Sequence, residues 1–167
     1  NQLTDLPLAF GNLTKLVYLD LKNNDFSVIP EVIFSLPKLG FLDLGNNKIV
    51  KISESISKLK NALKYIELRK NQITELPDSF CELTNLIEIG LDYNQLIRLP
   101  DSIGNLEYLE RFKLSENNLT ELPKSMDSLK NLEYLDLSRN LLVSYPADVA
   151  NIKLINVVYY GNPNPEK

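Results

Sequence analysis

Carboxylate side chains recur along this sequence at intervals of 23 or 24 residues, at Asp20, Asp43 and Glu67. Such a row could coordinate a cation, select a basic peptide or take part in acid–base chemistry. Metal binding is the weaker interpretation, because adjacent strands would hold these carboxylates about 5 Å apart without convergent backbone ligands. A solvated acidic row is the simpler alternative, and we expect no metal and no cofactor.

Aromatic side chains follow the same interval, at Tyr18, Phe41 and Tyr65. Exposed aromatic rings supply large contact area with few rotors, which is typical of binding surfaces. The alternative is that the rings favour strands and shield one another across neighbouring strands. Phe41 carries no polar group that would account for exposure, so the pattern favours a binding surface.

The composition limits the function further. The chain has 167 residues, 44% hydrophobic, with a net charge of −4 and no long basic run, which predicts one folded domain without a nucleic-acid site or membrane insertion. It contains no His, the commonest general base, and no phosphate-binding loop, so we expect no enzyme. The lone Cys81 cannot form an internal disulfide, and no targeting segment is visible, so the sequence leaves the localisation undetermined.

The elements that carry these side chains are internal repeats. The motif LxxLxLxxNxL occurs six times, beginning at Leu16, Leu39, Leu63, Leu86, Leu109 and Leu132. Its alternation predicts a short strand with the leucines inward and their neighbours facing solvent. The Asn that follows each strand, at Asn24, Asn47, Asn71, Asn94, Asn117 and Asn140, offers an amide to backbone groups of its own and adjacent loops. We expect this asparagine column to be structural.

Most units continue as xLPxxIxxL, in which proline fixes φ at Pro7, Pro30, Pro77, Pro100, Pro123 and Pro146. The following apolar residues, Ile33, Phe80, Ile103, Met126 and Val149, are expected to fill the inner layer there.

The repeated pattern resembles the leucine-rich repeat superfamily, in particular the 23-residue subgroup of Ras-suppressor, scribble and erbin-type proteins and similar bacterial proteins. The resemblance implies an α/β solenoid: a horseshoe of six to seven repeats and a partial N-terminal one. A parallel sheet would form its concave face, with irregular, 3-10 or short helical segments on its convex face. We expect one domain over residues 1–162, with units starting near 16, 39, 63, 86, 109, 132 and 154, and a tail over 163–167.

Two departures from the pattern predict local irregularity. The second unit has Ser53 in the proline position and one extra residue, so its convex segment at residues 50–62 should be longer or more helical. The last unit could start at Leu154 or at Ile155, and we prefer Leu154 because it places Asn162 in the asparagine column. The chain begins within a repeat, at Asn1, which suggests an excised or mature segment.

Function in such a solenoid is expected on the concave face, where variable positions of successive units form columns. The candidate ligand-binding residues are Tyr18, Asp20, Phe41, Asp43, Tyr65, Glu67, Arg69, Tyr93, Arg111, Lys113, Tyr134, Asp136 and Arg139. We expect a protein or peptide partner, anchored by the aromatic and acidic half, with Arg111, Lys113 and Arg139 giving polarity. The alternatives are a structural spacer in a larger protein and a bacterial secreted or surface protein that engages host molecules.

Overall fold

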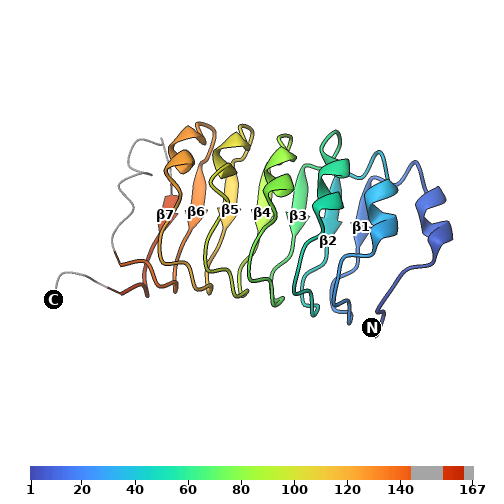
Figure 1. The fold of residues 1–167 in the computed structure, drawn as a ribbon, viewed down its shortest axis with the longest axis horizontal. Coiled ribbons are helices and arrows are strands. Elements are labelled where there is room, and N and C mark those ends of the chain that lie inside the picture. Colours follow the sequence, from blue (N-terminus) through green and yellow to red (C-terminus); the bar gives the residue numbers. More distant parts are fainter. Residues whose placement is uncertain (144–155, 164–167) are drawn as a thin grey trace.

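The fold is an open solenoid whose repeats lie side by side along one axis (Figure 1). The computed structural model describes residues 1–143 and 156–163. Its seven strands form one parallel sheet in the order of the sequence. The strands are β1 (Tyr18–Asp20), β2 (Phe41–Asp43), β3 (Tyr65–Glu67), β4 (Glu88–Gly90), β5 (Arg111–Lys113), β6 (Tyr134–Asp136) and β7 (Asn156–Val158).

Short 3-10 helices form the opposite, convex layer of the repeats up to residue 128. They are η1 (Leu8–Asn12), η2 (Glu31–Ser35), η3 (Glu54–Leu59), η4 (Asp78–Glu82), η5 (Ile103–Asn105) and η6 (Lys124–Ser128). Proline precedes four of them, at Pro7, Pro30, Pro77 and Pro123. The strands, the 3-10 segments and the single open sheet confirm the predicted solenoid.

The core lies between the two layers. The middle residue of each strand from β1 to β6 is buried, as the alternation predicts: Leu19, Leu42, Ile66, Ile89, Phe112 and Leu135. From the helical side, Ile33, Phe80, Ile103 and Met126 are fully buried, whereas Pro146 and Val149 lie outside the described residues. Each repeat therefore packs its apolar side against its neighbours.

The second unit has the longer convex segment that its sequence predicts. Its helix η3 has six residues, where η2 and η4 have five. Ser53, in the place of proline, caps this helix: its hydroxyl accepts a hydrogen bond from the Ser55 amide at 3.2 Å. A Ser N-cap satisfies a backbone amide that would otherwise lack a partner at the helix start.

The asparagine column ties neighbouring turns together. Asn117, for example, donates through Nδ2 to the carbonyl oxygens of Leu91 and Leu114 at 2.9 and 3.0 Å, and its Oδ1 accepts from the Leu96 amide at 3.0 Å. The same pattern recurs along the column, and all six members are buried. Each amide thus satisfies buried backbone groups of its own repeat and of the preceding one.

The last repeat follows the register that starts at Leu154, although Leu154 and Ile155 lie outside the described residues. Val157 pairs with Leu135, and the Asn162 side chain takes the place of the asparagine column. Its Nδ2 donates to the Leu137 carbonyl at 2.9 Å, and its Oδ1 accepts from the Leu142 amide at 3.1 Å.

The residue before each column asparagine has a left-handed backbone. The positions are Asn23, Asn46, Lys70, Tyr93, Glu116 and Arg139, with φ between 53° and 57°, and Gly161, with φ of 78°. This conformation costs a non-glycine residue about 1–2 kcal/mol, so the surrounding turn must impose it. The repeated turn therefore gives the side chains of these residues the same direction, whatever the residue type.

Candidate functional site

The three aromatic side chains of the first strands form a continuous group on the concave face, called the aromatic patch below. The Tyr18 and Phe41 rings stack with centroids 4.4 Å apart and planes 7° apart. Phe41 and Tyr65 follow at 6.3 Å with a 37° tilt. The stacking agrees with mutual shielding, yet Tyr18 remains 58% exposed and Tyr65 38% exposed, while Phe41 is half-buried. The patch therefore still offers aromatic surface to solvent.

Val17 is a further exposed apolar residue next to Tyr18, and its carbonyl accepts a hydrogen bond from the Phe41 amide at 3.0 Å; it was not singled out from the sequence. It precedes β1 and is 57% exposed. Its counterpart in the next repeat is Gly40, and a Cβ at Gly40 would lie 3.6 Å from Val17 Cγ1. Val17 directly follows Leu16, a leucine of the repeat motif, so the sequence pattern did not distinguish it from the core residues.

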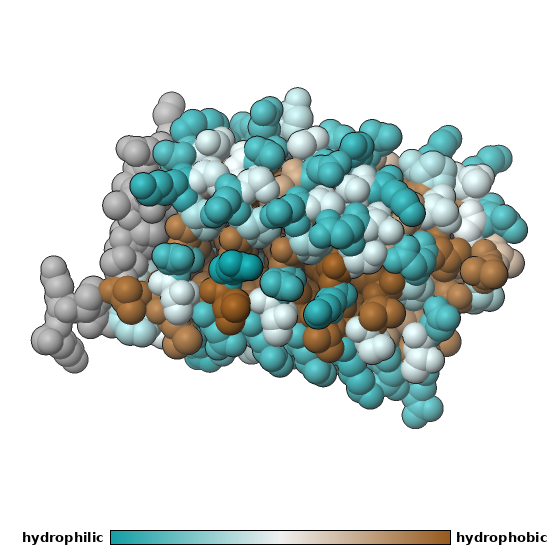
Figure 2. Space-filling model, viewed as in Figure 1, coloured by the Kyte–Doolittle hydropathy of each residue, from teal (hydrophilic) through white to brown (hydrophobic). Residues whose placement is uncertain are grey.

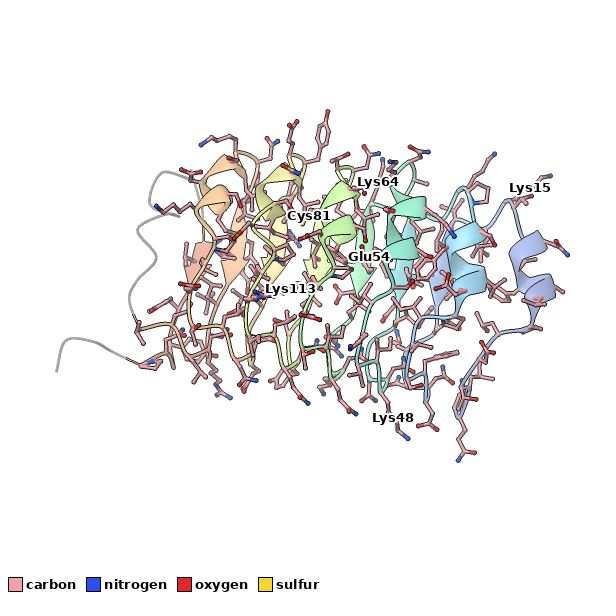
Figure 3. The ribbon with its side chains drawn as sticks, viewed as in Figure 1. Lys15, Lys48, Glu54, Lys64, Cys81 and Lys113 are labelled. Atoms are coloured by element: carbon pink, nitrogen blue, oxygen red, sulfur yellow. The ribbon has the colours of Figure 1, made fainter. Side chains whose placement is uncertain are left out.

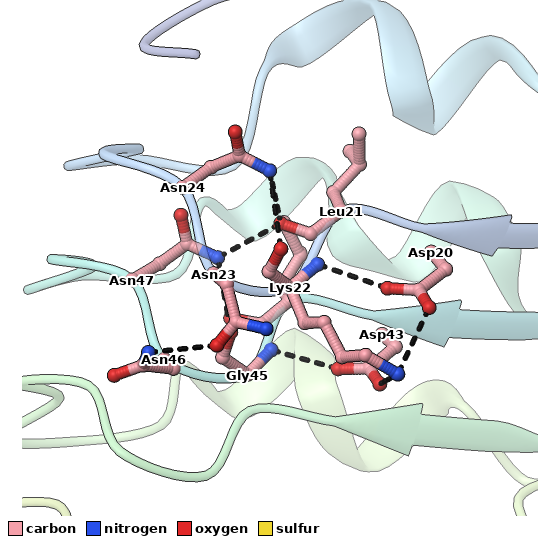
Figure 4. Close-up of polar contacts among 10 residues, drawn as sticks. Asp20, Leu21, Lys22, Asn23, Asn24, Asp43, Gly45, Asn46 and Asn47 are labelled. Atoms are coloured by element: carbon pink, nitrogen blue, oxygen red, sulfur yellow. Dashed lines mark hydrogen bonds and ion pairs between the residues drawn. The ribbon is translucent and has the colours of Figure 1, made fainter. Parts of the chain in front are cut away.

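The first two acidic residues share one lysine (Figure 4). Lys22 Nζ lies 3.0 Å from Asp20 Oδ2 and 3.8 Å from Asp43 Oδ2. Burial acts to raise the pKa of Asp20, but the hydrogen bonds from the Lys22 amide and ammonium outweigh it and lower that pKa. Asp43 Oδ1 accepts a hydrogen bond from the Gly45 amide at 2.8 Å.

The third acidic residue reaches across a whole strand. Glu67 Oε1 on β3 lies 3.4 Å from Lys113 Nζ on β5, and Lys113 also pairs with Glu88. Burial raises the pKa of Glu67, and Lys113 only partly offsets this. Burial acts to lower the pKa of Lys113, but the two glutamates outweigh it and raise that pKa. Lys113 therefore stays protonated, and two glutamates share its charge.

The remaining polar candidates are also mostly engaged. Asp92 Oδ1 accepts from the Ser115 amide and hydroxyl at 3.1 and 2.8 Å, and burial raises its pKa despite these bonds. Asp136 Oδ1 likewise accepts from the Ser138 amide and hydroxyl, at 2.9 and 2.7 Å.

The other candidate residues of the concave face also contact neighbouring side chains. Tyr134 donates to Asp136 Oδ2 at 3.5 Å. Arg139 pairs with Glu116, and Lys70 Nζ lies 5.7 Å from the centre of the Tyr93 ring. Burial, followed by the negative charge of Asp136, raises the pKa of Tyr134.

Arg69 and Arg111 differ from the other candidate cations. Within residues 1–143 and 156–163, neither guanidinium makes an ion pair or a side-chain hydrogen bond. Of the three cations expected to give polarity, Arg111, Lys113 and Arg139, only Arg111 has no ion pair among the described residues. Arg111 lies in a hollow that also contains Glu133 and Tyr134.

The described residues contain no group of three or more His, Cys, Asp or Glu side chains placed to hold a metal ion. Cys81, labelled with Lys113 in Figure 3, is buried in η4, and burial raises the pKa of its thiol. A buried thiol of raised pKa packs as a small apolar group. Among the described residues no helix is long and apolar enough to cross a membrane.

Exposed aliphatic side chains also occur away from the sheet. Val28, Ile97 and Val143 are each more than half exposed, and Leu8 is 90% exposed. Hydrophobic residues form a band across the side of the molecule shown in Figure 2. These exposed aliphatic side chains are not accompanied by rows of charged or aromatic side chains like those on the concave face.

Two solved structures match nearly the whole chain. The leucine-rich repeat protein LIC12759 of Leptospira interrogans is 36% identical, with a TM-score of 0.90 over 99% of this chain and 43% of that one. An internalin (inlF) of Listeria monocytogenes matches with a TM-score of 0.86 at 22% identity, over 97% of this chain and 46% of that one, and supports the fold alone.

A curated relative matches part of the chain. The probable serine/threonine-protein kinase pats1 of Dictyostelium discoideum is 37% identical over 97 residues, which are 56% of this chain and 3% of the kinase. The chain thus spans less than half of each of these three proteins.

Two family models match the sequence itself. One, described as a leucine-rich repeat region, covers residues 33–117, and the other, described as a leucine rich repeat, covers residues 1–49 and 98–142. Proteins of this family generally serve as protein-interaction modules and are typically non-catalytic. Together with the seven-stranded parallel sheet, these matches show that the chain belongs to the leucine-rich repeat family.

Proposed function

We propose that this domain is a non-catalytic module that binds a protein or peptide on its concave face, with the aromatic patch as anchor. The observation that carries the proposal is the contiguity of Tyr18, Phe41 and Tyr65, which stack in sequence while their surface stays partly open. Rigid aromatic rings give contact area at low entropic cost, and binding energy concentrates on such residues. Val17, exposed next to Tyr18 in the sequence, is a further apolar residue near the patch.

The experiment uses random linear peptides displayed on phage, selected on the immobilised wild-type domain. Peptides recovered in this way are synthesised, and their dissociation constants are measured by calorimetry. The double variant Phe41→Asp, Tyr65→Ala is expected to lose at least about tenfold in affinity, since truncation of an anchor residue costs 2 kcal/mol or more. Circular dichroism and urea unfolding check that the variant is folded.

Tyr108→Ala is the matched control. Tyr108 is 59% exposed, like Tyr18, but precedes β5 in the loop that follows η5. Its removal should leave peptide affinity unchanged. Wild-type affinity in the folded double variant, or an equal loss in Tyr108→Ala, would refute the concave anchor.

A structural spacer within a longer protein is the second candidate, favoured by the small share of each relative that this chain spans. It predicts that no selected peptide depends on the aromatic patch. A bacterial secreted protein that engages host molecules is a variant of the first candidate, suggested by the bacterial source of the Leptospira match. It differs from the first candidate in compartment and partner, and it keeps the same binding face.

A further inference from the structure

A hollow on the concave face lies next to the aromatic patch, and the charged side chains in and around it carry more negative than positive charge. Its charged lining residues are Lys22, Asp43, Glu67, Arg69, Asp92 and Lys113. The two lysines also pair with carboxylates just outside this lining, Asp20 and Glu88. Five carboxylates thus share three cations, which leaves an excess of two negative charges.

The excess is clearest where one lysine lies between two aspartates (Figure 4). Lys22 Nζ lies 3.0 Å from Asp20 Oδ2 but 3.8 Å from Asp43 Oδ2, and the second distance is beyond that of a hydrogen bond. Asp43 Oδ1 accepts from the Gly45 amide, whereas Asp43 Oδ2 accepts no hydrogen bond from the described residues. A second cation at this point would complete the pairing of the two aspartates.

The neighbouring carboxylate, Glu67, is also short of positive charge. Burial is the largest cause of its raised pKa, and Lys113 acts in the opposite direction. The negative charges of Glu88 and Asp43 raise the pKa of Glu67 further. A carboxylate that lies among other carboxylates is stabilised in its ionised form by any additional cation nearby.

The aromatic patch lies directly beside these aspartates. Tyr18 and Asp20 are two residues apart on β1, as are Phe41 and Asp43 on β2, so ring and carboxylate share one face of the sheet. The rise of a strand separates the members of each pair by about 6.6 Å. A long basic side chain can cover this distance, with its apolar stem on the rings and its charged head at the carboxylates.

We propose that the concave face binds a basic segment of a protein or peptide, in which an arginine side chain lies on the aromatic patch and its guanidinium pairs with Asp20 and Asp43. This inference rests on the proposed function and assigns its ligand chemistry. A guanidinium stacks on aromatic rings and presents a planar fork of donors to carboxylates, so arginine suits both halves of this surface. Lys22 remains between the two aspartates, and the ligand adds the positive charge that they lack.

The test repeats the phage-displayed selection on the wild type and on two double variants of equal net charge. Peptides selected on the wild type are expected to be enriched in Arg and Lys. The variant Asp20→Asn, Asp43→Asn removes both acceptor charges, while the new Oδ1 atoms can still accept the hydrogen bonds from the Lys22 and Gly45 amides. Peptides selected on this variant should lose the basic enrichment.

Asp25→Asn, Asp101→Asn is the matched control. Asp25 pairs with Lys48 at 2.7 Å, so its replacement leaves a lysine without its partner, as Lys22 is left in the test variant. Asp101 is exposed in the turn before η5, and neither residue belongs to a strand. This variant should retain the basic preference. Circular dichroism and urea unfolding check that both double variants are folded.

Synthetic peptides then identify the charge that is recognised. Replacing the selected arginine by citrulline keeps the shape of the side chain and removes its charge. This change should weaken binding to the wild type about tenfold, because it leaves the two aspartates without the added cation. It should have an effect of about twofold or less on Asp20→Asn, Asp43→Asn, and an undiminished tenfold effect there would overturn the proposed pairing.

The outcomes separate this proposal from the one it rests on. Peptides that depend on Phe41 and Tyr65 but show no basic preference, or whose preference survives Asp20→Asn, Asp43→Asn, would overturn the basic ligand and leave the concave anchor intact. An acidic preference on the wild type would overturn it as well. Peptides that ignore the aromatic patch would overturn the proposed function itself, and this inference with it.

Discussion

Glu67 and Lys113 belong to strands that are not neighbours, and their side chains nevertheless form an ion pair, with Glu67 Oε1 3.4 Å from Lys113 Nζ. The strand between them, β4, carries Gly90 at the position that faces both. A Cβ at Gly90 would lie 2.0 Å from Glu67 Oε2. The absence of a side chain at one position thus permits a contact across two repeats.

Because of this contact, we expect Gly90→Ala to lower the free energy of unfolding through its effect on the Glu67 side chain. The methyl group would displace the Glu67 carboxylate and break the ion pair with Lys113, at a cost of about 1 kcal/mol in the free energy of unfolding. In a Glu67→Ala background the same change should be neutral or slightly stabilising, because alanine replaces glycine in a strand. Urea unfolding of the four proteins in this double-mutant cycle measures the difference.

Gly104→Ala is the control for that cycle. Its Cβ would lie 2.2 Å from the Ser125 carbonyl oxygen, a backbone atom that cannot swing aside. It should cost about 1–3 kcal/mol whether or not Glu67 is present. An equal cost of Gly90→Ala in both backgrounds would contradict the mechanism.

The asparagine column makes a prediction about two adjacent residues of the same type. Asn117 is 5% exposed and its side chain is bonded to its own repeat and to the preceding one, whereas Asn118 is exposed and its side chain has no hydrogen bond to described residues. Asn117→Ala leaves buried backbone groups without partners and should lower the free energy of unfolding by about 1–3 kcal/mol. Asn118→Ala should change it by less than about 0.5 kcal/mol, and comparable losses in both would show that the amide is not what matters.

Much of the fold could be predicted from the sequence because each repeat contains its own core and turn residues. Leu19, Leu42 and Asn47 lie where the motif places them, since burial and amide bonding depend only on positions within adjacent units. The same logic identified the longer segment at Ser53.

The electrostatics of the concave face could not be predicted in this way. The partner of Glu67 lies 46 residues away, and the contact depends on the missing side chain of Gly90. The position of a residue within the repeat predicts whether its side chain faces solvent, but it does not predict which charged side chains form ion pairs with one another. That is why Asp20, Asp43 and Glu67 read as an acidic site in the sequence, whereas two lysines engage them in the structure.

Asp92 makes a prediction about the pH dependence of stability. Burial raises the pKa of this carboxyl in the native state, because the hydrogen bonds from Ser115 only partly offset the loss of solvation. The native protein therefore binds this proton more readily than the unfolded chain does. Ionised Asp92 lowers stability above its native pKa, and that cost is relieved as the pH falls through the native pKa towards the unfolded value of about 3.9.

Asp92→Asn removes this ionisation while its Oδ1 can still accept both hydrogen bonds from Ser115. The variant is expected to be more stable than the wild type near pH 7, and the difference should shrink as the pH approaches about 3. Urea unfolding at several pH values in this range measures it. Asp101→Asn, an exposed position, controls for the general effect of removing one negative charge from a chain of net charge −4. If Asp92→Asn is less stable than the wild type near neutral pH, the hydrogen bonds from Ser115 must stabilise the ionised carboxylate by more than its burial costs, and the pKa of Asp92 would then be lowered in the native state.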